Sequence, residues 1–584
     1  MKRFFSTFGA ALLAFIVGVL ILWLVIVAVL GGVMSSFSPR AAAVSENSVL
    51  VIDFANGIVD SPENGFSPDL INGRFDVSNT LLDVVNAIRC AATDNNIKGI
   101  YINNVGYGVI NTANTEELRA ELQRFKDSGK FIVAYNDTYT QGMYWLSSVA
   151  DKVYLNPEGT LEWHGLAGSV YFYKGLLDKL GVDVQIIRHG TFKSAVEPYI
   201  SNEMSPANRL QMTTLVESMW QVLLDDISAS RGIPVERLRE YAEQLTVASP
   251  EDAVRLEMVD GLRYADEVAA ELNALAGVEK ANMVKLSSYI SGLVDRKISR
   301  NKIAVIYADG QIVNGESSNG SVGDLTLTKQ IAEARNDDGV KAVVVRVNSP
   351  GGSALASENI WREMELCRAV KPVIISMGGM AASGGYYISS PADVVFADRT
   401  TTTGSIGVFG TIPNVGRALK DKLGVSVDVV KTSPSADIGT WTRALTGPEK
   451  AYLQNNVEKC YSTFVGHVAS GRNMTFEQVD SIGQGRVWLG TDAERIGLID
   501  GFGGLTDAIG LAAERAGVAD DYRVTEIYQT NSLSMVLELL KGASVKTSGV
   551  VDGVNGGLKY IDGIMRAVEK SGVMAMMPYE LVVK

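Results

Sequence analysis

The run Gly-Met-Ala-Ala-Ser-Gly-Gly-Tyr-Tyr, residues 379–387, decides how the rest of this chain is interpreted. It follows Lys-Pro-Val-Ile-Ile-Ser (371–376), a short apolar run that is typical of a buried parallel strand. The residues after it are typical of the start of a helix. We therefore expect Ser383 at a strand-to-helix turn, beside backbone amides that suit a developing oxyanion. The alternative is a tight glycine-rich turn without chemistry.

Length and composition narrow the class of protein. A chain of 584 residues predicts two or more domains, and 46% hydrophobic with 20% charged residues is the composition of a folded protein. The net charge of −13 argues against nucleic acid as a partner. The few cysteines and histidines show neither a disulfide framework nor a metal-binding spacing, so we expect no metal or other cofactor. They are Cys90, Cys367, Cys460, His164, His189 and His467.

The amino-terminal region predicts a membrane anchor. Lys2 and Arg3 precede residues 10–33, which carry no charge and are numerous enough to span a bilayer as a helix. The basic residues favour a cytoplasmic position for residues 1–9 and place the rest outside the cytoplasm. The alternative is a cleaved signal peptide, because residues 41–43 are all alanine, but its apolar core is usually only about 7–15 residues long. A polar linker covers residues 34–46.

From residue 47 the chain alternates between strand and helix patterns. Residues 49–54, 98–103 and 130–135 read as strands, and residues 81–92 and 115–128 read as amphipathic helices. Short strands joined by crossover helices predict an α/β fold built on a parallel sheet.

The same pattern then occurs a second time. Asn-Asn-Ile-Lys-Gly-Ile-Tyr-Ile (95–102) matches Asp-Gly-Val-Lys-Ala-Val-Val-Val (338–345), and Lys-Leu-Gly-Val occurs at 179–182 and 422–425. Both lysine pairs in these matches are separated by 243 positions. Ordered matches at one spacing indicate a tandem duplication. We predict a first half over 47–298, a second half over 299–528 and an unmatched tail over 529–584.

The two halves differ where chemistry would take place. At the level of Ser383 the first half has Thr140 and Gln141, and at the level of Asn-Ser-Pro-Gly-Gly-Ser (348–353) it lacks the Pro-Gly-Gly. The first half carries instead Phe-Lys-Ser-Ala-Val-Glu-Pro (192–198), whose Lys193 aligns near Ala436. Each half thus has a group that the other lacks, which predicts one composite site for each pair of halves.

A serine hydroxyl needs a base to act as a nucleophile. A lysine serves where an apolar environment lowers its pKa, and Ser–Lys pairs are an established variant of the catalytic triad. Lys193 lies among apolar residues, whereas the rival Lys431 lies in the second half itself. The alternative for Lys193 is an ordinary surface lysine. A Ser299-to-Lys302 spacing in a charged linker is set aside as chance.

Two further motifs complete the candidate site. Amides of Gly352 and Gly384 would form an oxyanion hole, although a glycine-rich turn is common in this kind of fold. Ser405, within Thr-Gly-Ser-Ile-Gly (403–407), would accept a hydrogen bond from a lysine ammonium or merely cap a turn.

Four motifs together carry a family resemblance: Phe-Lys-Ser-Ala-Val-Glu-Pro (192–198), Ser-Pro-Gly-Gly-Ser (349–353), Ala-Ala-Ser-Gly-Gly-Tyr-Tyr (381–387) and Thr-Gly-Ser-Ile-Gly (403–407). The chain resembles the long bacterial form of the signal peptide peptidase A family, peptidase family S49, over essentially its whole length, although the tail beyond about Tyr528 is unmatched.

The resemblance implies a tandem ClpP/crotonase-like fold and a homotetramer in the bacterial inner membrane, with its catalytic part facing the periplasm. It implies a serine endopeptidase that degrades cleaved signal peptides and other hydrophobic peptides without a cofactor. Ser383 would be the nucleophile, Lys193 the general base and Ser405 the residue that positions the lysine, with the amides of Gly352 and Gly384 as the oxyanion hole.

Two other classes of protein remain open from the sequence. A crotonase-type acyl-CoA enzyme shares the fold and the oxyanion loop but has no use for Ser383, Lys193 or an anchor. A catalytically inactive membrane scaffold also carries an anchor and a duplicated domain.

Overall fold

A computed structural model describes residues 18, 44–64, 66–69, 74–103, 110–293, 299–318, 320–528 and 574–576. The predicted anchor over residues 10–33, apart from residue 18, and most of the predicted tail lie outside these residues. Within the described ranges, no helix combines the length and the apolar character needed to cross a membrane.

The first half is built on a six-stranded parallel sheet in the order β10-β8-β7-β6-β1-β11. The runs of β-branched residues that predicted its strands are almost wholly buried, because helices cover both faces of a parallel sheet. The predicted helix over 81–92 is α2 (Leu81–Thr93), which Thr80 caps, and the one over 115–128 is α3 (Thr112–Asp127), which Asn111 caps. The strands are β1 (Ser48–Ile52), β6 (Ile97–Asn103), β7 (Phe131–Tyr139), β8 (Lys152–Leu161), β10 (Gly261–Leu262) and β11 (Asn282–Lys285).

The second half contains an eight-stranded sheet of the same kind, with a main order of β21-β19-β17-β15-β12-β23; β18 pairs with β17, and β22 pairs with β18. Only β21 runs antiparallel to its neighbour. The strands are β12 (Lys302–Asp309), β15 (Val340–Ser349), β17 (Val373–Ala382), β18 (Val394–Ala397), β19 (Thr402–Gly404), β21 (Val487–Leu489), β22 (Gly501–Phe502) and β23 (Arg523–Ile527).

Contacts as well as motifs are duplicated. Tyr144 donates to the carbonyl of Met258, and Tyr386 donates to the carbonyl of Leu498, both at 2.7 Å. The carboxylate of Asp260 accepts from the amide of Val153, as that of Asp500 accepts from Val395, again at one shared distance of 2.8 Å. Equivalent side chains therefore do equivalent structural work in each half, which confirms the tandem α/β organisation.

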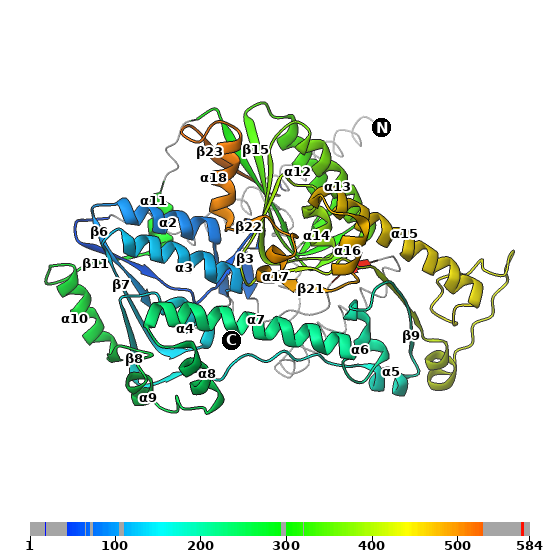
Figure 1. The fold of residues 1–584 in the computed structure, drawn as a ribbon, viewed down its shortest axis with the longest axis horizontal. Helices are drawn as coiled ribbons and strands as arrows, with labels where there is room; N and C mark the ends of the chain where they lie inside the picture. Colours follow the sequence, from blue (N-terminus) through cyan, green and yellow to red (C-terminus); the bar gives the residue numbers. More distant parts are fainter. Residues whose placement is uncertain are drawn as a thin grey trace, which may run out of the picture.

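A third sheet joins the two halves. Its order is β14-β13-β16-β24-β20-β9, and among these strands only β9 belongs to the first half. Strand β9 pairs antiparallel with β20 along its whole length, from Asp183 opposite Asn414 to Arg188 opposite Phe409. The strands are β9 (Asp183–Arg188), β13 (Gln311–Val313), β14 (Ser321–Gly323), β16 (Gly351–Ser353), β20 (Phe409–Asn414) and β24 (Met574–Met576). In Figure 1 the long helix α7 (Pro206–Arg231) runs beneath both halves.

A buried charge cluster also fastens the halves together. Arg346 on β15 is wholly buried and forms ion pairs with Asp60 at 2.7 Å and Glu117 at 2.6 Å, both from the first half. A buried ion pair contributes more to a unique arrangement than to net stability. This cluster therefore helps to define how the first half sits on the second.

Candidate functional site

Ser383 lies between β17 and the short helix α14 (Gly384–Ser389), as its motif predicted. Its backbone has φ of 57° and ψ of −112°, outside the region that most non-glycine residues occupy. Its amide donates to the carbonyl of Gly404 at 2.8 Å, and its side chain makes no capping bond to α14. Strain of this kind is often found at functional sites, where the surrounding structure holds it.

Lys193 belongs to a segment of the first half that extends to Ser383. We call residues 189–196 the lysine arm. It follows β9 directly, so the pairing of β9 with β20 carries it into the second half. Residues far apart in the sequence meet here because one strand of the first half is a member of the shared sheet.

The structure brings Ser383 and Ser405 into contact with Lys193. The Nζ atom of Lys193 lies 2.8 Å from the Oγ atom of Ser383, 2.9 Å from that of Ser405 and 3.2 Å from the Ser405 carbonyl oxygen. All three residues are at most 2% exposed. The Nζ atom also lies 5.9 Å from the centre of the Phe409 ring.

This environment favours the neutral form of the lysine. Burial lowers the pKa of the Lys193 ammonium to about 7, because the ammonium loses its hydration. Its three hydrogen-bond partners are neutral oxygens. A large fraction of Lys193 is therefore unprotonated at neutral pH and able to accept a proton from the serine 2.8 Å away.

The two glycines predicted for the oxyanion hole are neighbours in space. A Cβ atom built on Gly384 would lie 3.1 Å from the amide nitrogen of Gly352 and 2.7 Å from the Oγ atom of Ser357. One on Gly352 would overlap the carbonyl oxygen of Ile312. Only glycine fits at these two positions, and the fit places the start of α14 directly against β16.

Beside this point, β16 and β20 flank one strand position, called the groove below, which β24 occupies. Strand β24 pairs antiparallel with β16 on one side, where Gly352 faces Ala575, and with β20 on the other, where Phe409 faces Met574. The space between β16 and β20 therefore holds one extended strand. Met574 packs against an apolar cluster of Ala195, Val196 and Phe409.

The other candidates for a base lie elsewhere. Lys431 forms an ion pair with Asp437 at 2.6 Å, and Lys302 forms one with Asp337 at 2.8 Å. Within the described part of the chain, none of the three histidines makes a hydrogen bond to Ser383. The three cysteines are free, and no cluster of three or more metal-ligating side chains occurs among the described residues.

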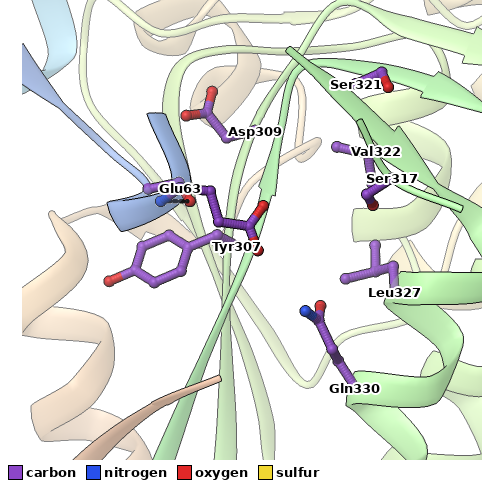
Figure 2. A pocket seen from close by; sticks show the side chains of 9 residues that line it. Glu63, Tyr307, Asp309, Ser317, Ser321, Val322, Leu327 and Gln330 are labelled. Carbon is purple, nitrogen blue, oxygen red and sulfur yellow. Dashed lines mark hydrogen bonds between the residues drawn. The ribbon is translucent and has the colours of Figure 1, made fainter. Parts of the chain in front are cut away.

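A separate polar cavity lies beside β12 and contains neither Lys193 nor Ser383 (Figure 2). It is lined by Ser61 and Glu63 of the first half and by Tyr307, Asp309, Ser317, Ser321, Val322, Leu327 and Gln330. Burial, reinforced by the nearby Asp60, raises the pKa of Asp309 to about 6. The Oδ1 atom of Asp309 accepts from Asn348, which in turn accepts from the amide of Met380. This cavity wall thus braces the strand that leads to Ser383.

Several residues around the site had no signal in the sequence. Phe409, Gly485 and the strand β24 reach it through the shared sheet and through loop packing. A Cβ atom on Gly485 would lie 2.6 Å from that of Lys193, so this glycine leaves room for the lysine arm. A Gly-Gln-Gly-Arg run (483–486) was the available hint, and it carries no distinctive chemistry.

Comparison with known proteins identifies the family of this chain. The model of peptidase family S49 matches residues 124–279 and 365–519, one segment in each half. Protease 4 of Salmonella typhi is 39% identical over 513 residues, covering 85% of this chain and 82% of that protein. Protease 4 of Haemophilus influenzae is 37% identical over 476 residues, covering 78% and 77%. A chloroplastic serine protease SPPA of Arabidopsis thaliana is 30% identical over 497 residues, covering 82% and 72%.

Among solved structures, a ClpP1 mutant from Listeria monocytogenes covers 36% of this chain and 95% of its own, with 13% identity and a TM-score of 0.24. Assignment of each half to the ClpP/crotonase type stays a prediction. The sequence matches, by contrast, are long and cover most of this chain and most of each relative.

The fold and the matches define a tandem serine peptidase. The chain belongs to peptidase family S49, which confirms the family resemblance drawn from its motifs. Membership favours a peptidase over the acyl-CoA enzyme and the inactive scaffold.

Proposed function

We propose that this protein is a membrane-anchored endopeptidase that uses a Ser383–Lys193 dyad to degrade hydrophobic peptides, cleaved signal peptides among them. The observation that carries the dyad is the distance of 2.8 Å between Lys193 Nζ and Ser383 Oγ in a buried site. In the first step, neutral Lys193 takes the hydroxyl proton while Ser383 attacks the peptide carbonyl.

The later steps use the same two groups. The ammonium of Lys193 protonates the leaving amine, which departs and leaves an acyl ester on Ser383. A water molecule then gives its proton to Lys193 and attacks the ester, and the proton returns to Ser383 as the acid leaves. Ser405 holds the lysine through both of its oxygens during these transfers.

The amides of Gly352 and Gly384 would stabilise the oxyanion. Removing one such donor costs about 3 kcal/mol of transition-state stabilisation in hydrolases of this kind. The close contact between β16 and the start of α14 supports this pairing of donors.

An extended, apolar substrate would fit the groove in place of β24. The pairing of β24 with both β16 and β20 supports binding of a peptide as an added strand, in which backbone bonds give affinity. The packing of Met574 on Ala195, Val196 and Phe409 supports an apolar side chain at that point. Signal peptides have apolar cores, so they suit such a groove.

Anchoring by residues 10–33, a periplasm-facing site and a homotetramer complete the proposal. The anchor rests on the uncharged run behind Lys2 and Arg3, and its orientation rests on these two basic residues together with the family resemblance. The homotetramer rests on the family resemblance alone. Fractionation of cells that produce the full-length chain, with protease accessibility from each side, tests the anchor and its orientation. Recovery of the chain in the soluble fraction would contradict them.

Turnover of two fluorogenic peptides of equal length tests the activity. One peptide has an apolar core, and the other has aspartates in its place. The full-length protein should cleave the apolar peptide at least tenfold faster, and Ser383→Ala should cleave neither. An absence of cleavage together with an absence of fluorophosphonate labelling at Ser383 would contradict the proposed activity.

A further inference from the structure

We propose that His189 is a positioning residue that locks the lysine arm onto the second half and so fixes Lys193 against Ser383. This inference rests on the proposed Ser–Lys chemistry. It concerns a histidine that the proposed mechanism does not use and that lies four positions before the lysine.

The lysine arm needs a contact that fixes it to the second half, because the strand pairing between β9 and β20 ends before it. The last pair of the β9–β20 ladder is Arg188 with Phe409, and the amide of His189 donates to the carbonyl of Val408 at 3.1 Å. The chain then bends at Gly190, whose φ is 102°. Lys193 follows this bend, so its position depends on what fixes the start of the arm.

The side chain of His189 is fixed from two sides. Its ring stacks on that of Tyr461 with a centroid separation of 3.7 Å and an angle of 20°. Its Nδ1 atom lies 2.5 Å from the Oε2 atom of Glu458. Tyr461 and Glu458 both belong to α15 (Gly447–Arg472) of the second half, so this contact joins the arm to a long, rigid element.

The same ring also reaches the loop that shapes the lysine site. Its Nε2 atom lies 3.4 Å from the Nε2 atom of Gln484. The carbonyl of Gln484 accepts from the amide of Phe192 at 2.9 Å. The next residue, Gly485, packs directly on the Lys193 backbone. His189 therefore holds both the arm and the surface against which Lys193 packs.

The loop also connects to the third member of the site. The amide of Gly485 donates to the carbonyl of Ile406, and the amide of Ser405 donates to the carbonyl of Arg486, both at 2.7 Å. A shift of residues 484–486 would thus move Lys193 and Ser405 together. Misplacement of a reacting group by about 1 Å costs on the order of a hundredfold in rate.

The hydrogen-bond partners define which ring nitrogen of His189 donates and which accepts. The Nε2 atom of Gln484 also lies 2.6 Å from the carboxylate of Asp480, which assigns that atom as the donating amide nitrogen. The Nε2 atom of His189 then accepts from it, and Nδ1 donates to Glu458. His189 thus bridges Gln484 and Glu458 through its two ring nitrogens.

The chain supplies a matched control in His467. This ring stacks on Trp361 at 3.5 Å and 21°, and its Nε2 atom lies 3.0 Å from the Oε2 atom of Glu358. Its ring also meets that of Tyr387 edge-on at 5.5 Å, but His467 touches no part of the lysine arm. His467→Ala thus removes the same kind of stacking and carboxylate contact away from Lys193.

The test compares His189→Ala, His189→Gln and His467→Ala in the full-length protein, with a fluorogenic apolar peptide across pH. His189→Ala should lower kcat by about tenfold to a hundredfold with KM within about twofold, since Lys193 is misplaced rather than the groove altered. The pH midpoint of kcat should rise, because a loosened lysine is better hydrated. His189→Gln, which keeps a donor and an acceptor, should recover part of the rate. His467→Ala should keep the parent midpoint.

Hydrogen exchange of the amides of residues 190–196 gives a second readout that needs no activity. His189→Ala should speed it, and His467→Ala should not. If His189→Ala leaves kcat, midpoint and exchange at the parent values, the inference is wrong, even where Lys193→Ala abolishes turnover. If the parent shows no turnover and no labelling of Ser383, the proposed function fails instead. Unchanged exchange in His189→Ala would then also reject the role of His189 in holding the lysine arm.

Discussion

Two equivalent strand-to-helix turns, one in each half, have opposite properties. In the first half, Thr140 has φ of −69° and ψ of 161°, and its hydroxyl caps α4 (Gln141–Ser147) by accepting from the amide of Met143 at 3.3 Å. In the second half, Ser383 has φ of 57°, and its Oγ atom accepts a hydrogen bond from the Nζ atom of Lys193. A hydroxyl that satisfies its own helix stabilises a fold, whereas one held away from its helix by backbone strain is available for chemistry.

The residue after each turn shows the same contrast. Gln141 fills the first turn with a side chain whose Oε1 atom accepts from the amides of His164 and Gly165 at 3.0 and 2.9 Å. Gly384 has no side chain, which lets it lie directly against Gly351 and the amide of Gly352. The first half thus uses its own side chain to satisfy amides, and the second half has no side chain at the equivalent position.

The largest effect in this comparison is expected from removal of the dyad. Ser383→Ala and Lys193→Met should each lower kcat/KM for an apolar peptide by a factor on the order of 10⁴ or more, because neither group acts without the other. The double variant should be no worse than either single one. Near-parent activity in Lys193→Met would mean that another group is the base, with Lys431 the first to test.

Gly384→Gln transfers the side chain of the first turn to the second. Its Cβ atom would approach Ser357 and the amide of Gly352 and crowd the space proposed for the oxyanion. We expect kcat to fall by about a hundredfold or more, since an oxyanion donor is worth 10²–10³ in rate. Circular dichroism checks that the fold persists. A folded variant with parent kcat would show that Gly384 is not at the oxyanion.

Removal of the Ser405 hydroxyl should have an intermediate effect. Ser405→Ala loses the contact at 2.9 Å and keeps the carbonyl contact at 3.2 Å, so Lys193 stays near Ser383 with less restraint. A hydrogen bond to a charged group is worth about 1.5–3 kcal/mol, which corresponds to a fall in kcat of about tenfold to a hundredfold. Steady-state kinetics at the optimal pH measure this fall in kcat. An unchanged kcat would mean that the Ser405 hydroxyl serves only the structure of its turn.

The smallest effect belongs to the first turn. Thr140→Ala removes a helix cap and should lower the free energy of unfolding by about 1 kcal/mol. Peptidase activity should stay at the parent value, because Thr140 is not part of the composite site. Denaturant unfolding measures the first quantity, and peptide turnover measures the second. A large loss of turnover in a folded Thr140→Ala protein would contradict the division of labour between the halves.

The contrast also shows how far the sequence predicts this molecule. Short apolar runs and amphipathic patterns predicted strands and helices of the first half, because these signals are local, and the repeated motifs predicted the duplication. The proximity of Lys193 to Ser383 was expected from what each half lacks and from the family resemblance, not from any local pattern. Its physical cause, the addition of β9 to the sheet of the other half, has no local signature. The same holds for Phe409, His189 and Gly485, whose roles follow from packing between distant segments.

The central claim is that a buried lysine from one half activates the serine of the other. The most direct test is the rate at which a fluorophosphonate labels Ser383 between pH 5 and 10, in the parent and in Lys193→Met. The pKa of Lys193 is lowered to about 7, so the base is protonated below this value and free above it. The parent rate should rise with pH to half its maximum near pH 7, and the rise should be absent in Lys193→Met. An unchanged rate and midpoint in Lys193→Met would contradict the claim.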